Sequence, residues 1–142
     1  MLRVQAFGEI KEKLARAEGL ADELAAGWEA FQFIVMVADH YSRLTSEQFA
    51  MWMFAIPPAS DGRDYVGRAP SMRRDPAPCA EVPDLTAVSE DDAADGLAAI
   101  AGTLATSLQA MKDAASNQAD VQACTRAAET ATEVRNLLAA SG

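Results

Sequence analysis

Residues 28–38 read WEAFQFIVMVA, and this stretch decides the fold. Apolar side chains follow a helical spacing from Leu20 to Ala38, while Phe33 and Val37 add apolar surface on another face. A helix that is apolar on several faces is normally buried on several sides. We therefore predict a helix over 20–44 whose middle part forms the centre of an all-α protein.

A preceding helix is indicated by apolar side chains at spacings of three and four, namely Phe7, Ile10, Leu14 and Ala17. This pattern predicts a helix over 3–18. Gly19 is placed to end it, because glycine readily takes the left-handed conformation found just after a helix.

A short helix is predicted after the central one. Residues 45–48 read TSEQ, which matches a capping box with Thr45 as the N-cap. The helix would cover 46–56. It is predicted to stop before Pro57 and Pro58, because neither proline has an amide N–H to donate to the preceding turn.

The C-terminal third is rich in alanine and predicts a helical hairpin. Ser89 is followed by three acidic residues, a typical start for a helix over 89–112. Asn117 can cap a second helix over 117–140. The small side chains of this hairpin bury little apolar area each, so it needs the aromatic half of the chain or a second copy of itself. We therefore predict a homodimer.

These elements form one predicted domain over 1–142, an all-α bundle of about five helices. An irregular loop over 57–88, which holds all six prolines, would cross the outside of the bundle.

Because loops of this length are usually functional, the loop over 57–88 is the first candidate site. Its glycines would leave the neighbouring guanidinium groups free to bind a carboxylate or phosphate. The candidate residues are Arg63, Asp64, Tyr65, Arg68, Arg73 and Arg74. The alternative is that these arginines pair with acidic helices of the same protein.

A second candidate site consists of aromatic side chains. Trp28 and Trp52, with Phe31, Phe33, Phe49 and Phe54, could line a pocket for an apolar ligand between helices. At helical spacing the same side chains are more often simply core, and the alanine-rich half contributes no aromatic residue to a core.

Composition excludes several classes of function. The 142 residues include 12 Lys and Arg against 21 Asp and Glu, a formal net charge of −9. Such a charge disfavours binding to nucleic acid or anionic membranes and favours a basic protein partner.

The two cysteines, Cys79 and Cys124, are too few for a disulfide framework or a four-ligand zinc site. With no visible leader or membrane segment, we expect a cytoplasmic protein with free thiols and no cofactor.

Two short motifs resemble parts of known families. The pairs Glu9/Glu12 and Asp92/Asp95 are similar to the paired carboxylates of all-α, metal-dependent nucleotide pyrophosphatases, although that family has Glu at the first place of the second pair. The resemblance implies that these four carboxylates would hold magnesium; solvated helix surface explains them as well. His40 resembles the phosphorylated histidine of helical phosphotransfer domains, but Arg43 and Leu44 replace the lysine and glycine of that motif. The alternative is a structural histidine.

Three functions follow from these patterns. The first is a non-enzymatic acidic interaction protein, meaning an oligomeric adaptor, chaperone or inhibitor that binds a protein partner. The second is a helical bundle that binds a small molecule or anion through the aromatic core and Arg63 or Arg68. The third is a magnesium-dependent hydrolase similar to the pyrophosphatases. The first is preferred because no coherent catalytic constellation is visible in the sequence.

Overall fold

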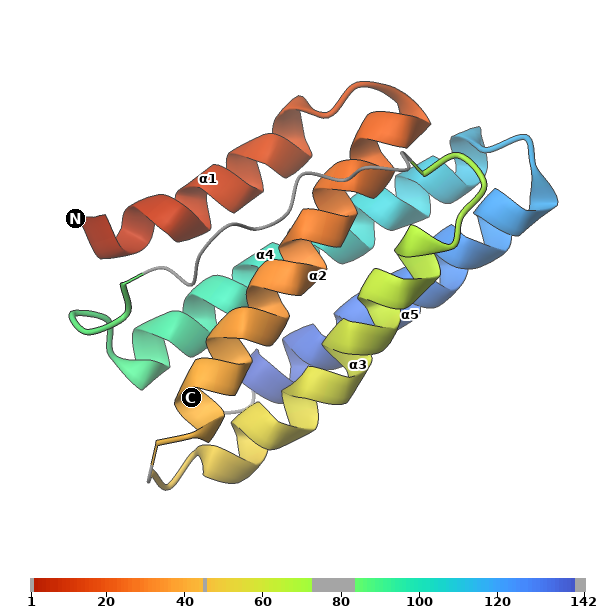
Figure 1. The fold of residues 1–142 in the computed structure, drawn as a ribbon. Coiled ribbons are helices and arrows are strands. Elements are labelled where there is room, and N and C mark those ends of the chain that lie inside the picture. The colour runs from red at the N-terminus through yellow and green to blue at the C-terminus, as the bar shows by residue number, and fades with distance from the viewer. Residues whose placement is uncertain (1, 45, 73–83, 140–142) are drawn as a thin grey trace.

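The computed structural model describes residues 2–44, 46–72 and 84–139. These contain five helices and no strand, as predicted (Figure 1). The helices are α1 (Leu2–Arg16), α2 (Gly19–Ser42), α3 (Phe49–Gly67), α4 (Glu90–Ala114) and α5 (Gln118–Ala139).

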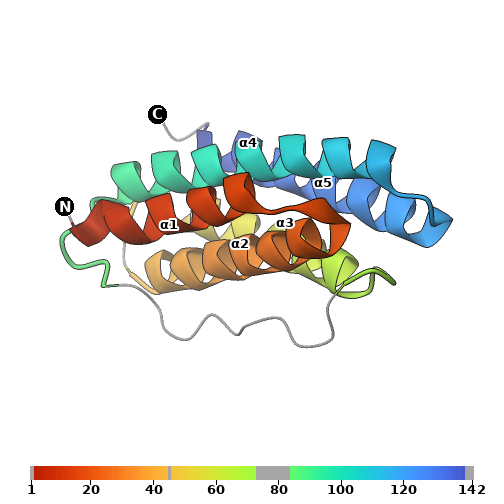
Figure 2. The same cartoon turned by 90° about the horizontal axis from the view of Figure 1, so that it is seen from above.

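Four of the helices form a closed ring. Helix α2 packs on α3, α3 on α5, α5 on α4, and α4 on α2, while α1 packs on both α2 and α4 (Figures 1 and 2). Neighbours in the ring run antiparallel, as Figure 1 shows. Helices α3 and α4 lie diagonally across the ring and run in the same direction. The segment 68–89 therefore has to connect opposite ends of the bundle, so topology alone requires a long connection at this place.

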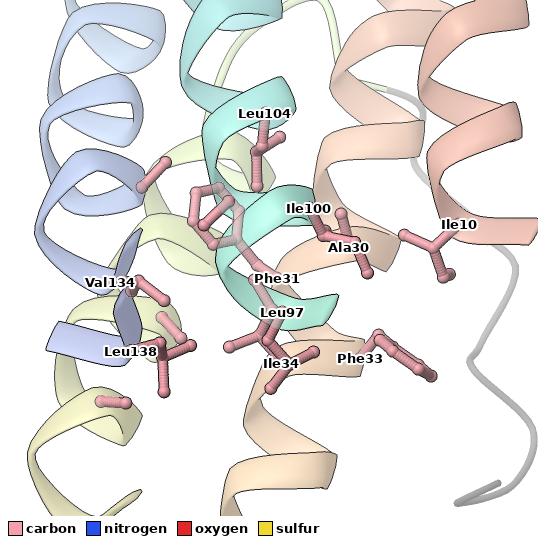
Figure 3. Packing of buried hydrophobic residues seen from close by; sticks show 14 of the residues in the cluster. Ile10, Ala30, Phe31, Phe33, Ile34, Leu97, Ile100, Leu104, Val134 and Leu138 are labelled. Atoms are coloured by element: carbon pink, nitrogen blue, oxygen red, sulfur yellow. The ribbon is translucent and has the colours of Figure 1, made fainter. Parts of the chain in front are cut away.

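The core is one cluster to which all five helices contribute (Figure 3). Phe31 and Ile34 of α2 lie at its centre with no exposed surface and meet Leu97 and Leu104 of α4. This confirms that the stretch 28–38 is the central element. The alanine-rich hairpin contributes small side chains, among them Ala101 and Ala128, which are fully buried because the other helices cover them.

Local signals set most of the helix ends. The Ser89 hydroxyl accepts a hydrogen bond from the amide of Asp92 at 3.0 Å, and Asn117 Oδ1 accepts one from the amide of Ala119 at 2.8 Å. Gly19 separates α1 from α2 with a φ of +84°, a left-handed conformation that favours glycine. The starts predicted for the two hairpin helices are confirmed, whereas the first helix already ends at Arg16 and Gly19 is the first residue of α2.

Helix α3 differs from the prediction. It begins at Phe49 with Gln48 at the N-cap position, and it runs on to Gly67 with Pro57 and Pro58 inside it. A helix is therefore confirmed over most of 46–56, whereas its predicted end at residue 56 and the predicted irregular loop over 57–67 are wrong. The predicted cap at Thr45 lies outside the described residues, as does the part of the predicted loop over 73–83.

Tertiary packing explains why the prolines do not end α3. Ala55, Ala59 and Val66 lie on one face of the helix and have no exposed surface. This apolar stripe continues at helical spacing across the prolines and would be lost if the helix stopped. The prolines deprive the carbonyls of Met53 and Phe54 of their helical donors, but both of these residues are exposed on the outer face.

None of the helices in the described ranges combines the length and hydropathy that a bilayer crossing demands.

Candidate interaction surface

Two of the arginines predicted as a flexible anion site, Arg63 and Arg68, lie in or directly after the C-terminal half of α3. Arg63 Nη1 donates a hydrogen bond to Gln32 Oε1 of α2 at 2.7 Å, and Nη2 donates to Ser60 Oγ at 3.1 Å. Its Nε lies 3.5 Å from Asp64 Oδ1. The guanidinium is therefore held against α2 by its own chain. Arg68 is the C-cap residue of α3, and Arg73 and Arg74 lie outside the described residues.

Tyr65 lies on a different side of α3 from Arg63. It faces α5, where the guanidinium of Arg126 lies 5.8 Å from the centre of the tyrosine ring. The two side chains line an open groove of about 540 Å³ between α3 and α5, together with Thr130 and Glu129. Arg63 and Tyr65 therefore lie on different sides of α3, so the predicted candidate residues do not form a single binding site. Sequence reasoning missed Arg126, which no local motif marks.

The two tryptophans lie at opposite ends of the α2–α3 pair. Trp28 is half-buried and lies beside Gly67, near the end of α3. Trp52 is fully buried near the start of α3 and stacks on Tyr41, with ring centres 4.9 Å apart. They therefore do not line a common pocket. Phe31 and Phe33 are core residues, but Phe49 and Phe54 are not.

The carboxylate pairs occupy helix surface. Glu9 and Glu12 are exposed on α1, and Asp92 and Asp95 are exposed on α4. Within residues 2–44, 46–72 and 84–139, no group of three or more His, Cys, Asp or Glu side chains is placed to hold a metal ion. His40 is half-buried at the end of α2 and meets the ring of Tyr41 edge-on, with centres 5.0 Å apart.

Buried acidic residues gather near the N-terminal ends of α2 and α5. Asp120 accepts hydrogen bonds from the amide and hydroxyl of Ser71, at 3.0 and 2.6 Å, and so fixes the chain that leaves α3. Burial and the charge of Asp22 raise the pKa of Glu23. Burial, with the charges of Asp120 and Glu23, raises the pKa of the Cys124 thiol to about 11. Cys124 is therefore a neutral core side chain at ordinary pH.

The most unusual surface of the molecule is apolar. The large apolar side chains that are exposed in the described residues all lie between positions 44 and 54: Leu44 (44 %), Phe49 (48 %), Met53 (46 %) and Phe54 (65 %). We call these four the apolar patch. Single exposed apolar residues need no explanation, but a cluster of this kind marks an interaction site or a liability. Taking about 200 Å² for each fully exposed side chain of this size, the patch exposes about 400 Å².

An anchor beside the patch fixes the rotation of α3 about its own axis. Trp52 Nε1 and Ser46 Oγ both donate to Glu90 Oε2 at 3.0 Å, so the start of α3 is fastened to the start of α4. The Tyr41 hydroxyl donates to the carbonyl of Val88 at 3.1 Å, and burial and the charge of Glu90 raise its pKa. Because Trp52 is held inward, its neighbours Met53 and Phe54 are turned outward.

The prolines remove two backbone donors from the helix beside the same surface. The carbonyls of Met53 and Phe54 cannot receive helical hydrogen bonds from positions 57 and 58. Sequence reasoning placed Phe49 and Phe54 in the core. The available signal was the spacing of Trp52, Ala55, Ala59 and Val66, which identifies the buried face once the helix is allowed to continue through the prolines.

Comparison with protein-family models, with curated proteins and with solved structures found no significant match to this chain.

Proposed function

We propose that the chain is a non-enzymatic interaction protein whose apolar patch docks a protein partner. The observation that carries the proposal is the gathering of exposed large apolar side chains at Leu44, just after α2, and at Phe49, Met53 and Phe54 in the first part of α3. An interface of standard size buries about 800 Å² on each partner, of which somewhat more than half is apolar. The patch, at about 400 Å², supplies the apolar part of one such interface.

The rigidity of the surroundings supports this proposal. The patch lies on a helix whose inner face is buried against α2 and α5 and whose start is fastened to Glu90. A surface held in one orientation loses little conformational entropy when a partner binds. Adaptor, chaperone and inhibitor remain the classes of activity that such a surface would serve.

The homodimer predicted from the sequence stays a prediction, with a different basis. The expectation rests on the small side chains of the alanine-rich hairpin, which need other helices or a second copy to bury their apolar stripe. In the structure the apolar stripe of this hairpin is buried by helices of the same chain. The apolar patch is the surface that a homodimer would most readily use.

The groove between α3 and α5 favours a second candidate function, the binding of a small polar ligand. Tyr65 and Arg126 offer an aromatic face and a guanidinium, and the groove volume of about 540 Å³ falls within the range of small-molecule sites. Ligand screening by protein NMR would test this, because a true ligand should shift resonances of this groove and lose affinity in Arg126→Gln.

The leading proposal is tested by capture of partners with matched variants. Met53→Gln with Phe54→Gln makes the patch polar and keeps good helix formers, whereas Ala110→Gln changes an exposed position of α4 as the control. We expect partners retained by the wild type and the control to be lost by the double variant, with equal melting temperatures. Retention of the same proteins by all three would overturn the proposal.

A further inference from the structure

The side chains that border the apolar patch are mainly acidic. Glu47 lies between Leu44 and Phe49 and is exposed. Asp61 is exposed one helical turn beyond Pro57, on the same outer face of α3. The patch is therefore bounded by a carboxylate at each end of its length along α3.

Helix α5 supplies further acidic residues along one side. A Cβ atom at Gly62 would collide with the hydroxyl of Thr130, so these two residues set the register between the antiparallel helices α3 and α5. In this register Leu137 lies level with the region of Phe54. Glu133 lies between Thr130 and Leu137 on the same side of α5 and is exposed, as is Glu129 one turn earlier.

The basic side chains of the same region each have a contact within the chain, although the side chain of Arg43 is 76 % exposed. Arg43 pairs with Asp39 at 3.0 Å, and Arg63 is bound to Gln32 and Asp64. Arg126 lies over the ring of Tyr65. The border therefore presents mainly carboxylates to a partner.

We propose that the apolar patch binds an amphipathic helix of a partner protein that carries Lys or Arg on both sides of its apolar stripe. The proposal rests on the proposed function and specifies the partner's chemistry. The apolar stripe would cover Phe49, Met53 and Phe54, while the basic side chains would meet Glu47, Asp61 and Glu133. A second copy of this chain fits less well, because it would bring an identical acidic border against this one.

The test uses two synthetic peptides of about 18 residues, long enough to form a helix on binding. Both carry the same leucine stripe; one has lysine and the other glutamate on its flanks. Binding of the fluorescein-labelled peptides to the full chain is followed by anisotropy. We expect the lysine peptide to bind at least about tenfold more tightly than the glutamate peptide, and this preference to shrink between about 50 and 500 mM salt.

Variants separate the two contributions. Met53→Gln with Phe54→Gln should abolish binding of the lysine peptide. Asp61→Asn with Glu133→Gln should weaken it about tenfold and reduce its salt dependence, whereas Asp113→Asn, an exposed carboxylate at the end of α4, should change neither. Circular dichroism checks that the variants remain folded.

The contrary results are distinguishable. Equal binding of both peptides would overturn the inference that the partner helix carries basic flanks. The proposal that the apolar patch is a docking surface would stand. If neither peptide binds, and sedimentation shows a dimer that Phe54→Gln converts to a monomer, the inferred partner would be wrong. The occupant of the patch would then be a second copy of this chain. If neither peptide binds and the chain is a monomer, this inference is overturned. The proposed function is overturned only if, in the capture experiment, the double variant also retains the same partners as the wild type.

Discussion

Gly62 is required for close helix packing, although a glycine at this place in the sequence predicts a flexible backbone. In the sequence it stands beside Arg63 and predicts a flexible backbone. In the structure it is buried inside α3, where a Cβ atom would collide with the ring of Phe31 and the hydroxyl of Thr130. Glycine is needed here because three helices approach closely, and its conformational freedom has no part in it.

The substitution Gly62→Ala should lower the free energy of unfolding by about 1–3 kcal/mol, the usual cost of an overpacked core. Gly8→Ala is the control, because a Cβ at Gly8 meets no atom within 4 Å. It should raise the free energy of unfolding by about 0.5–1 kcal/mol through helix propensity. Urea titration followed by circular dichroism measures both. A neutral Gly62→Ala would show that the helices cross less tightly than described.

Glu23 is a second residue whose burial has a measurable consequence. Its pKa is raised in the folded state by burial and by Asp22, so folding favours the protonated carboxyl. The contribution of this group to stability is present at low pH and is lost as the pH rises through the folded pKa. Glu23→Gln should therefore raise the melting temperature at pH 7 by about 2–4 °C.

The pH dependence makes the Glu23 prediction specific. The advantage of Glu23→Gln should shrink as the pH falls toward 4, because the wild-type carboxyl then also becomes neutral. Glu12→Gln, at a carboxylate whose side chain is 71 % exposed, should change the melting temperature little at any pH. An advantage of Glu23→Gln that stays constant across the titration would argue against burial of the charge as its cause.

At the scale of the element, α3 shows tertiary packing overriding a local stop signal. Two consecutive prolines cost a helix two hydrogen bonds and some steric strain. Helix α3 nevertheless continues, because Ala55, Ala59, Gly62 and Val66 are buried against neighbouring helices.

Pro57→Ala should stabilise the protein. Pro57 is exposed, and alanine would restore an amide donor for the carbonyl of Met53. The gain in free energy of unfolding should be about 1–2 kcal/mol, because the helix penalty of proline is partly offset by the stiffness it gives the unfolded chain. Pro58→Ala should gain less, since Pro58 is buried and its packing would be lost. Thermal unfolding measures both, and a lower melting temperature for Pro57→Ala would contradict this account.

At the scale of the whole molecule, one core joins all five helices, so we expect them to unfold together. Cys124 reports on this, because it is fully buried and its pKa of about 11 keeps the thiol neutral. In a Cys79→Ser background, labelling by a thiol reagent at pH 8 should follow the same urea dependence as circular dichroism. Labelling that precedes the loss of helicity would indicate separate opening of α5.

The same thiol adds to a loss of stability in alkali. The unfolded chain releases the Cys124 proton at a lower pH than the folded protein does, so the free energy of unfolding should fall as the pH rises from about 9 to 11. Tyr41, whose pKa is also raised by burial, acts in the same direction at higher pH. In the Cys79→Ser background, Cys124→Ala should show a smaller alkaline loss than its parent.

The sequence by itself determined the helices whose signals are local. The apolar pattern of 28–38, the left-handed turn at Gly19 and the caps at Ser89 and Asn117 act within a few residues, so they predicted α1, α2, α4 and α5 to within about two residues at each end. The preference for an interaction protein also came from charge and composition, and it stays a proposal.

Only the tertiary structure decided the length of α3 and the place of the candidate site. Whether the helix passes Pro57 depends on what its inner face buries, and that face is completed by α2 and α5 from distant parts of the chain. Once Trp52 is held inward by Tyr41 and Glu90, Phe54 must lie outside, because it is about 200° away around the helix. An aromatic side chain at helical spacing looks the same in sequence whether it faces a neighbour or solvent, because burial is a property of the assembled helices.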